Sequence, residues 1–241
     1  MNVAVVLPAY NEEGNLTPLI TALAKIAEGK DFGLRVIVVN DGSTDRTADE
    51  LKELQKHASL LDVVQHPANC GLAQALKTGI AAACRQKCDA AVFMDSDLSH
   101  RPEDMPKLVN ALSGGADVAL GSRFVPGGGM EGVPLWRVAI SRAGNGFGRR
   151  VLRLPMRDLT TGYRAIRRRV LESVVLGEDG FTIQLESVVK AYAAGYKIVE
   201  VPIVLGTRRY GRSSMSYTAQ LFRDYWRLLM ACRRWLREST S

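Results

Sequence analysis

Short apolar runs that alternate with helical segments are the feature that most constrains how this chain can fold. Runs at residues 2–7, 34–40, 61–66 and 90–94 are separated by segments with the spacing of amphipathic helices, and another run follows at 117–120. Strands that alternate with helices form right-handed βαβ units, in which the strands lie parallel. The chain therefore predicts an α/β fold, with a Rossmann-like, mostly parallel sheet flanked by helices.

Acidic residues follow three of these predicted strands. Glu12 comes after the first strand, Asp41 after the second, and Asp95 and Asp97 after the fourth. The carboxyl ends of parallel strands meet at one edge of the sheet, where α/β proteins bind ligands. In an extended chain Asp95 and Asp97 leave the same face, and oxygen ligands of this kind suit Mg²⁺ or Mn²⁺ bridging to phosphate. The alternative is that Asp95 is a turn residue and Asp97 caps the next helix.

Composition sets the broad class of the protein. A chain of 241 residues, 46% of them hydrophobic and 24% charged, fits one globular domain with a tail, which we place at residues 1–216 and 217–241. No apolar run reaches the roughly 18 residues that span a bilayer, and residues 1–7 are too short for a secretory signal. The four cysteines form no disulfide framework in a chain of this size and indicate a reduced, cytoplasmic protein. The net charge of +7 indicates anionic partners such as nucleotide, phosphate, nucleic acid or lipid headgroups.

Four motifs make the first half of the chain recognisable: PAYNEE, NDGSTDRT, NCGLAQALKTGI and MDSDLSHRPED. Together they resemble the glycosyltransferase family 2 enzymes, which have the GT-A fold of nucleotide-diphospho-sugar transferases. Later segments, among them GSRFVPGGG, RDLTTGYRAIRR and RRYGRSSMS, are similar to the dolichol-phosphate mannose synthase branch, whose members are polyprenyl-phosphate glycosyltransferases. The resemblance covers about residues 1–218.

The resemblance implies a donor site along the ligand-binding edge of the sheet. The implied donor-binding residues are Pro8, Tyr10, Glu12, Val39, Asp41, Met94, Asp95, Ser96, Asp97, Arg208 and Ser214. The implied ligands of Mg²⁺ or Mn²⁺ are Asp95, Asp97 and Ser99. Physically, the carboxylates of Glu12 and Asp41 can accept hydrogen bonds from a base or a ribose. Alternatively, Glu12 only interacts favourably with the dipole of the first helix, and Asp41 only stabilises a turn.

The resemblance also implies three arginines for the acceptor phosphate: Arg123, Arg137 and Arg142. Arg123 follows the strand at 117–120, and its planar guanidinium suits bidentate contact with phosphate. Asp97 and Arg123 are the expected catalytic residues. Two departures from the family pattern touch the diphosphate end of the site: Ser99 replaces the usual Gln, and Ser214 replaces the usual Lys. They leave the donor and the preferred metal open.

The resemblance implies an inverting transfer of mannose from GDP-mannose to a polyprenyl phosphate, such as dolichyl or undecaprenyl phosphate. The acceptor phosphate is already anionic near neutral pH, so the reaction needs no strong general base. The alternatives are another donor, UDP-glucose or UDP-N-acetylglucosamine, and a sugar-hydroxyl acceptor with Asp158 as its base. A non-catalytic adaptor for nucleic acid or anionic membrane would not need Asp95 and Asp97. We therefore expect no nucleic-acid partner.

The segment 217–237 predicts an amphipathic, basic C-terminal helix. Its apolar stripe consists of Leu221, Tyr225, Leu228, Leu229, Cys232, Trp235 and Leu236. The stripe is flanked by Arg223, Arg227, Arg233, Arg234 and Arg237. One interpretation is a helix docked on the domain. The other is an interfacial helix that attaches the protein peripherally to the cytoplasmic face of a membrane, a purpose that a small membrane partner protein could also serve.

Three further expectations are local. Asn11 is expected to cap the first helix, and Ser43 the second. His57 and His66 are expected on the surface. His100 is expected to lie beside the site without being a ligand.

Overall fold

The structure is a computed structural model that describes residues 1–28, 32–208 and 219–238. Its strands are β1 (Asn2–Ala9), β2 (Gly33–Asn40), β3 (Leu61–Gln65), β4 (Ala90–Phe93), β5 (Val118–Ser122), β6 (Gly129–Met130), β7 (Arg164–Arg167), β8 (Ile198–Pro202) and β9 (Val204–Leu205). Its α-helices are α1 (Leu16–Ala27), α2 (Thr47–His57), α3 (Leu72–Arg85), α4 (Met105–Ser113), α5 (Leu135–Leu152), α6 (Arg168–Ser173), α7 (Ile183–Ala193) and α8 (Ala219–Glu238). Short 3₁₀ turns precede α4 and α7, at Pro102–Asp104 and Gly180–Thr182.

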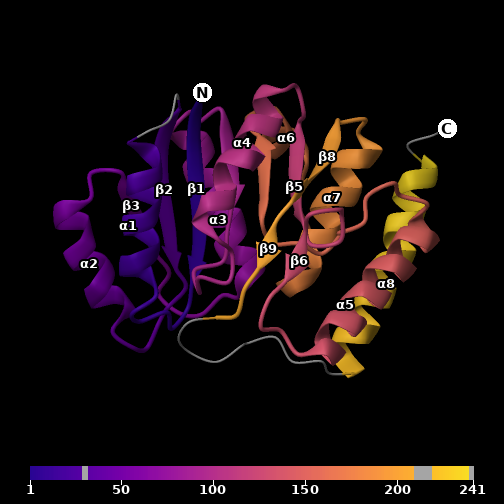
Figure 1. The fold of residues 1–241 in the computed structure, drawn as a ribbon, viewed down its shortest axis with the longest axis horizontal. Helices are drawn as coiled ribbons and strands as arrows, with labels where there is room; N and C mark the ends of the chain where they lie inside the picture. Colours follow the sequence, from indigo (N-terminus) through magenta and orange to yellow (C-terminus); the bar gives the residue numbers. More distant parts are fainter. Residues whose placement is uncertain (29–31, 209–218, 239–241) are drawn as a thin grey trace.

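Seven of the strands form one sheet in the order β3-β2-β1-β4-β7-β5-β8 (Figure 1). β1 pairs in parallel with β2 and β4, β2 with β3, and β5 with β8. Only β7 in this sheet runs antiparallel to its neighbours, β4 and β5. This confirms the predicted mostly parallel α/β fold. It also brings the carboxyl ends of β1, β2, β4 and β5 to the edge of the sheet at which β7 begins.

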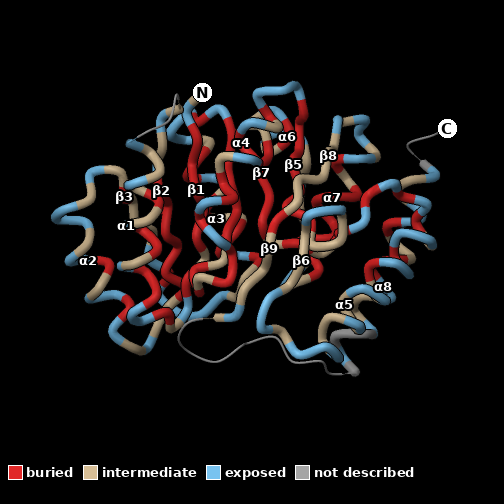
Figure 2. The backbone as a smooth tube through the Cα atoms, in the orientation of Figure 1, coloured by how far each residue is buried: buried red, intermediate tan, exposed pale blue. Residues whose placement is uncertain are grey.

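Helices cover both faces of the sheet, which is why its strands read as continuous apolar runs. Along β1, Val3, Val5 and Leu7 face a core shared with α1, α2 and α4, whereas Ala4 and Val6 face a core shared with α3, α6 and α7. The alternation follows from the two-residue period of a strand. Figure 2 shows the buried residues concentrated in the strands and on the inner sides of these helices.

The two helix caps expected from the sequence are wrong. α1 begins only at Leu16 and α2 only at Thr47. Asn11 and Ser43 instead join the loops that follow β1 and β2. The Thr44 N–H donates to Asn11 Oδ1 at 2.8 Å, and the Asn11 N–H donates to Ser43 Oγ at 3.0 Å. These side chains satisfy the neighbouring loop and are therefore not used at a helix terminus.

The C-terminal helix α8 packs on the domain against α5 and α7. Leu228, Leu229 and Cys232 are fully buried, and the Tyr225 hydroxyl donates to the Gly144 carbonyl at 3.3 Å. This central part of the predicted apolar stripe is therefore docked. Among the helices of the described residues, none has a stretch both long and apolar enough to cross a membrane.

Some predictions fall on parts of the chain that the structure does not describe. Ser214 and the expected domain boundary at residue 216 lie outside the described residues, and the same holds for the side chain of Leu221.

Candidate active site

A cleft of about 550 Å³ opens where β4 and β5 end and β7 begins. Its walls include residues of α5 and α7 and the segment that follows β9. The predicted site residues that line it are Asp95, Asp97, Ser99, Arg123, Arg137 and Arg208. The fold thus brings together residues that are far apart in the sequence. Arg142 is exposed and is not among the described residues that line the cleft. Its guanidinium lies 5.8 Å from the centre of the Phe124 ring.

The two aspartates that follow β4 are held differently. Asp97 is buried, and its Oδ1 accepts a hydrogen bond from the Ser99 N–H at 2.9 Å. Its Oδ2 lies 3.0 Å from Arg208 Nε. The Asp95 side chain is 44% exposed, so this carboxylate opens into the cleft. A pair of carboxylates, one of them open, is a donor set that suits a hard divalent cation.

Two carboxyl groups of the site have raised pKa values. Desolvation by the surrounding protein raises the pKa of Asp95, and the charge of Asp97 adds to the effect, whereas the charges of Arg208 and Arg123 oppose it. Desolvation also raises the pKa of Glu12 to about 7, although Arg208 and a hydrogen bond from Asn15 lower it. Both shifts show that the surrounding protein disfavours the ionised form of these two carboxyl groups.

His100 lies beside the site as predicted. Its Nδ1 accepts a hydrogen bond from the Asp95 N–H at 3.0 Å, which places the imidazole proton on Nε2. The ring stacks on Tyr163 with 4.8 Å between the ring centres. His100 therefore fixes the backbone of Asp95 and is itself buried.

Arg123 is anchored by Asp158. Its Nε and Nη2 donate to the two carboxylate oxygens, each at 2.7 Å, and its backbone N–H donates to Oδ2 at 3.0 Å. Nη2 also lies 3.2 Å from the Thr160 hydroxyl oxygen. Asp158 is fully buried by these contacts. Its carboxylate thus orients a guanidinium, and it does not have the access to the cleft that a general base requires.

Asp41 sits in a hydrogen-bonded cluster between β2 and the start of α3. Its carboxylate accepts from the backbone N–H groups of Cys70 and Gly71 and lies 2.6 Å from His66 Nδ1. His66 is therefore buried, and its expected surface position is wrong. Potential ligand atoms of Asp41, His66 and Cys70 lie within 4.8 Å of one another. Hydrogen bonds already satisfy Asp41, so Asp95 and Asp97 are the better candidates for a cation.

The remaining predicted donor residues differ in how accessible they are. Tyr10 is exposed, whereas Val39 and Met94 are buried in the two cores. Ser96 is also buried, and its hydroxyl donates to the Pro8 carbonyl at 2.8 Å. That hydrogen bond joins the end of β1 to the loop of the aspartates. The structure therefore brings Tyr10 to the surface and gives Ser96 a positioning contact.

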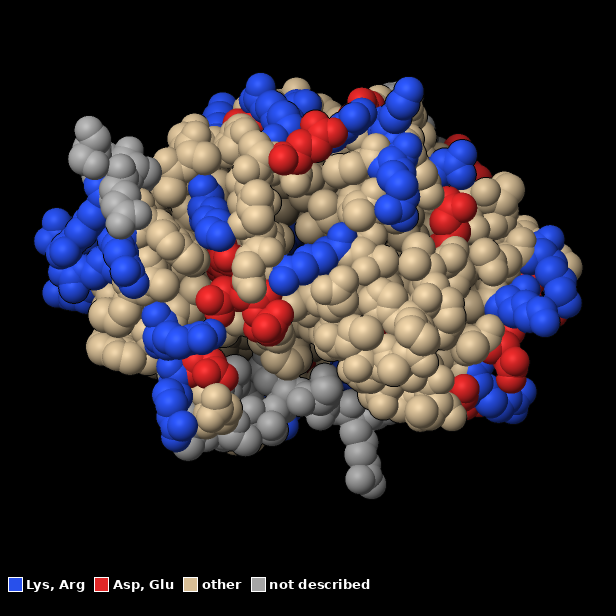
Figure 3. All heavy atoms as spheres, turned by 180° about the vertical axis from the view of Figure 1, so that it is seen from behind, with Lys and Arg blue, Asp and Glu red and all other residues tan. Residues whose placement is uncertain are grey.

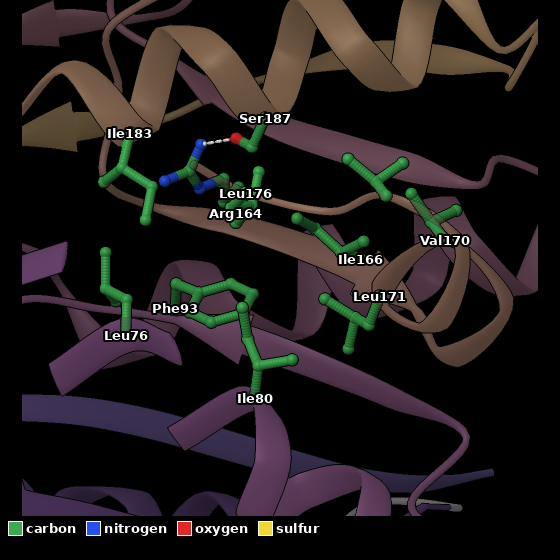
Figure 4. Close-up of a pocket in the computed structure, with 11 residues that line it drawn as sticks. Leu76, Ile80, Phe93, Arg164, Ile166, Val170, Leu171, Leu176, Ile183 and Ser187 are labelled. Atoms are coloured by element: carbon green, nitrogen blue, oxygen red, sulfur yellow. Dashed lines mark hydrogen bonds between the residues drawn. The ribbon is translucent and has the colours of Figure 1, made fainter. Parts of the chain in front are cut away.

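Arg164 is a buried cation behind the site that the sequence analysis missed. It lines a small apolar cavity of about 30 Å³, and Figure 4 shows its guanidinium reaching Ser187. Its Nη1 donates to that hydroxyl and to the Gln184 carbonyl at 2.8 Å. Desolvation lowers the pKa of Arg164 to about 10, and the charge of Asp95 opposes this shift. Arg164 is the first residue of β7 and precedes the apolar Ala165 and Ile166, and a charged residue next to this apolar pair was the available signal.

Carboxylates and arginines thus meet around one cleft at the carboxyl ends of a mostly parallel sheet, which is where α/β proteins bind their ligands. The model of the family described as Glycosyl transferase family 2 matches residues 4–175. The chain therefore belongs to this family.

Curated relatives agree with this assignment. A dolichol-phosphate mannosyltransferase of Pyrococcus furiosus is 36% identical over 219 residues, which cover 89% of this chain and 59% of that protein. A polyprenol monophosphomannose synthase of Mycolicibacterium smegmatis is 37% identical, with 88% of this chain and 80% of that one covered. An undecaprenyl-phosphate mannosyltransferase of Micrococcus luteus is 35% identical, with 90% and 88% covered. The chain thus spans somewhat over half of the first relative and most of the other two.

Solved structures confirm the GT-A fold. Glucosyl-3-phosphoglycerate synthase from Mycobacterium tuberculosis, in complex with Mn²⁺, UDP-glucose and phosphoglyceric acid, superposes with a TM-score of 0.69. The match covers 96% of this chain and 79% of the other at 24% identity. At that identity the likeness concerns the fold.

Proposed function

We propose that this protein transfers a sugar, mannose from GDP-mannose, to the phosphate of a polyprenyl phosphate with inversion at the anomeric carbon. The observation that carries the proposal is the composition of the cleft, where a carboxylate pair and arginines lie together. Three curated relatives named for mannosyl transfer to polyprenyl lipids support it.

The donor side follows from the strand ends. Glu12, Asp41 and the exposed Tyr10 lie at the ends of β1 and β2, where a nucleoside would be held. Asp95 and Asp97, with Ser99 beside them, would hold Mg²⁺ or Mn²⁺, which would neutralise charge that develops on the leaving diphosphate. The open carboxylate of Asp95 and its raised pKa fit such an ion.

The acceptor side supplies cations and an apolar wall. Arg123 and Arg137 line the cleft and would bind the lipid phosphate, with Arg142 nearby on α5. The apolar residues that line the same cleft fit the first units of an isoprenoid chain: Met130, Val133, Pro134, Ile140, Leu185 and Leu205. A phosphate oxygen attacks the anomeric carbon as the bond to the nucleoside diphosphate breaks, and no proton has to be removed first.

A sugar hydroxyl as acceptor is less compatible with this geometry. Such an acceptor needs a general base, and Asp158 is buried against Arg123. The identity of the donor sugar and of its nucleotide is therefore what the assay has to determine.

A lipid acceptor calls for attachment to the cytoplasmic face of a membrane. Leu135, Trp136 and Phe147 on α5 are exposed, and so is Trp226 on α8, whose ring stacks on Phe147. Exposed arginines of α5 and α8 and the residue that follows α5 accompany them: Arg149, Arg150, Arg153, Arg223, Arg227, Arg233, Arg234 and Arg237. Figure 3 shows Lys and Arg side chains gathered at the end of the molecule where α8 lies. Aromatic residues among arginines suit an anionic lipid surface.

The test is a donor panel in the presence of Mn²⁺. GDP-mannose, UDP-glucose and UDP-N-acetylglucosamine are each offered with undecaprenyl phosphate and with dolichyl phosphate, and the glycolipid product is measured. Product from GDP-mannose alone is the expected result. Product from a UDP-sugar alone would replace the donor, and absence of product from every pair would overturn the proposed function.

A further inference from the structure

Arg208 lies between two carboxylates of the donor side. Its Nε is 3.0 Å from Asp97 Oδ2, and its Nη1 is 3.3 Å from Glu12 Oε1. The three side chains are only 24%, 10% and 8% exposed, in the order Arg208, Asp97, Glu12. An ion pair so well shielded from water is stronger than a surface pair.

The ion pair with Arg208 occupies the Asp97 carboxylate, so another cation has to compete for it. The Ser99 N–H already donates to Oδ1 at 2.9 Å, and Arg208 uses Oδ2. Asp95, by contrast, opens into the cleft. A divalent ion coordinated by Oδ2 of Asp97 would meet the guanidinium at close range, and the two positive charges would repel each other. One of the two candidate ligands is therefore open and the other is occupied by the protein's own cation.

The charges of the site explain why the arginine is placed there. Glu12 and Asp97 are two buried acids, and both lie within ion-pair distance of Arg208, with Asp95 two residues from Asp97. Arg208 partly neutralises them. If a divalent cation took over that role at Asp97, the guanidinium would keep Glu12 and lose one of its two carboxylate partners. A guanidinium displaced from Asp97 would favour an oxygen of a diphosphate in its place.

We propose that Arg208 is an exchangeable internal cation that occupies Asp97 until metal and donor bind together. The proposal rests on the proposed function, since it assumes a donor with a diphosphate. Arg208 opposes binding of the metal alone and favours binding of the metal with the diphosphate. The two ligands therefore enter as a coupled pair, and the coupling is reciprocal.

The first test measures binding of Mn²⁺ alone by electron paramagnetic resonance. Arg208→Gln is expected to bind Mn²⁺ about tenfold more tightly than the wild type, within the usual range of coupling between sites. Arg137→Gln is the matched control, because Arg137 lines the same cleft and the change in net charge is equal. Unchanged Mn²⁺ affinity in Arg208→Gln, or an equal gain in Arg137→Gln, would overturn the proposal. Circular dichroism verifies that each variant folds. If Arg208→Gln does not fold, Arg208→Met is used in its place.

The second test adds GDP as the diphosphate probe. In the wild type, GDP is expected to tighten Mn²⁺ binding about tenfold or more, and in Arg208→Gln this gain should fall several-fold. An equal gain in both proteins would overturn the exchange. If UDP and not GDP produces the gain, the donor assignment fails while the role of Arg208 stands. If Mn²⁺ binds equally in the wild type and in Asp97→Ala, the metal site itself is wrong.

Discussion

The two sides of the cleft differ in the residues that form them. On the donor side, formed by the ends of β1, β2 and β4, loops are tied to one another by hydrogen bonds. The Glu12 N–H donates to Thr47 Oγ1 at 2.9 Å, and the hydroxyl of Ser96 donates to the Pro8 carbonyl at 2.8 Å. The acceptor side, formed by β5, α5 and α7, combines arginines with an apolar wall and continues into exposed aromatic residues.

The proposed substrates account for this difference. A nucleoside diphosphate is compact and highly charged, so it needs carboxylates and a cation fixed within a narrow tolerance. A polyprenyl phosphate has one charged end and a long apolar chain, so a cation and an apolar surface suffice. The donor side is therefore the part in which single substitutions should be most damaging.

The largest effect is expected on the donor side, for Asp97→Ala. Loss of a metal ligand removes several kcal/mol of transition-state stabilisation, so turnover should fall about a thousandfold or more. The fold should persist, since the carboxylate holds ions and does not pack in a core. Asp49→Ala, an exposed acid on α2, is the control. Metal-dependent activity within severalfold of the wild type would contradict the assignment.

On the acceptor side, Arg123→Lys should raise the KM for the lipid phosphate about tenfold, the equivalent of one charge-assisted hydrogen bond. A point charge would replace the planar guanidinium that is held by Asp158 and that we propose contacts the acceptor phosphate. Steady-state kinetics with each substrate varied in turn measures this. Arg101→Lys, at a surface ion pair with Glu131, should change neither constant. Weaker donor binding with an unchanged acceptor KM would move Arg123 to the donor side.

The raised pKa of Glu12 gives the donor side a pH-dependent stability. Between the ordinary value of 4.5 and about 7, the folded protein holds a proton on Glu12 that the unfolded chain has lost. Stability of the wild type should therefore fall as the pH rises through this window. Glu12→Gln lacks the titration, so its stability relative to the wild type should rise by on the order of 1–3 kcal/mol across the window. Urea denaturation at several pH values, without added metal, measures the difference; a constant difference would contradict the shift.

The smallest effect is expected at the exposed end of the acceptor side. Trp226→Ala and Trp136→Ala should each lower flotation with vesicles of anionic lipid severalfold, and added salt should lower it further. Point variants are preferable to removal of α8, because α8 buries Leu228 and Leu229 against the domain. Tyr192→Ala, an exposed aromatic on α7, is the control. Equal flotation of the wild type and the three variants would show that this surface does not bind the membrane.

The sequence predicted the sheet and much of the cleft because both depend on local patterns. Apolar runs such as Val36–Val39 are buried on both faces, and the acids that follow them must lie at the same edge. Asp95 and Asp97 were placed correctly beside the ligand-binding edge by that rule alone. The antiparallel strand β7 was not distinguished, because pairing direction depends on the whole topology.

Contacts between distant segments could not be predicted. His66 was expected on the surface because nothing in the neighbouring sequence indicates its hydrogen bond with the carboxylate of Asp41, 25 residues earlier. Asn11 was expected as a helix cap because its partner Thr44 lies in another loop. The pair between Arg208 and Asp97 likewise exists only once the segment after β9 returns to the donor side.

The most direct test of the central claim compares two acceptors that differ only in their phosphate. Purified protein is incubated with Mn²⁺ and GDP-mannose, and with either undecaprenyl phosphate or undecaprenol, and the lipid products are identified by mass spectrometry. We predict a mannosylated lipid phosphate from the first acceptor, with GDP released in equal amount, and no product from the second. Mannosylation of undecaprenol, or GDP release without a lipid product, would contradict the account.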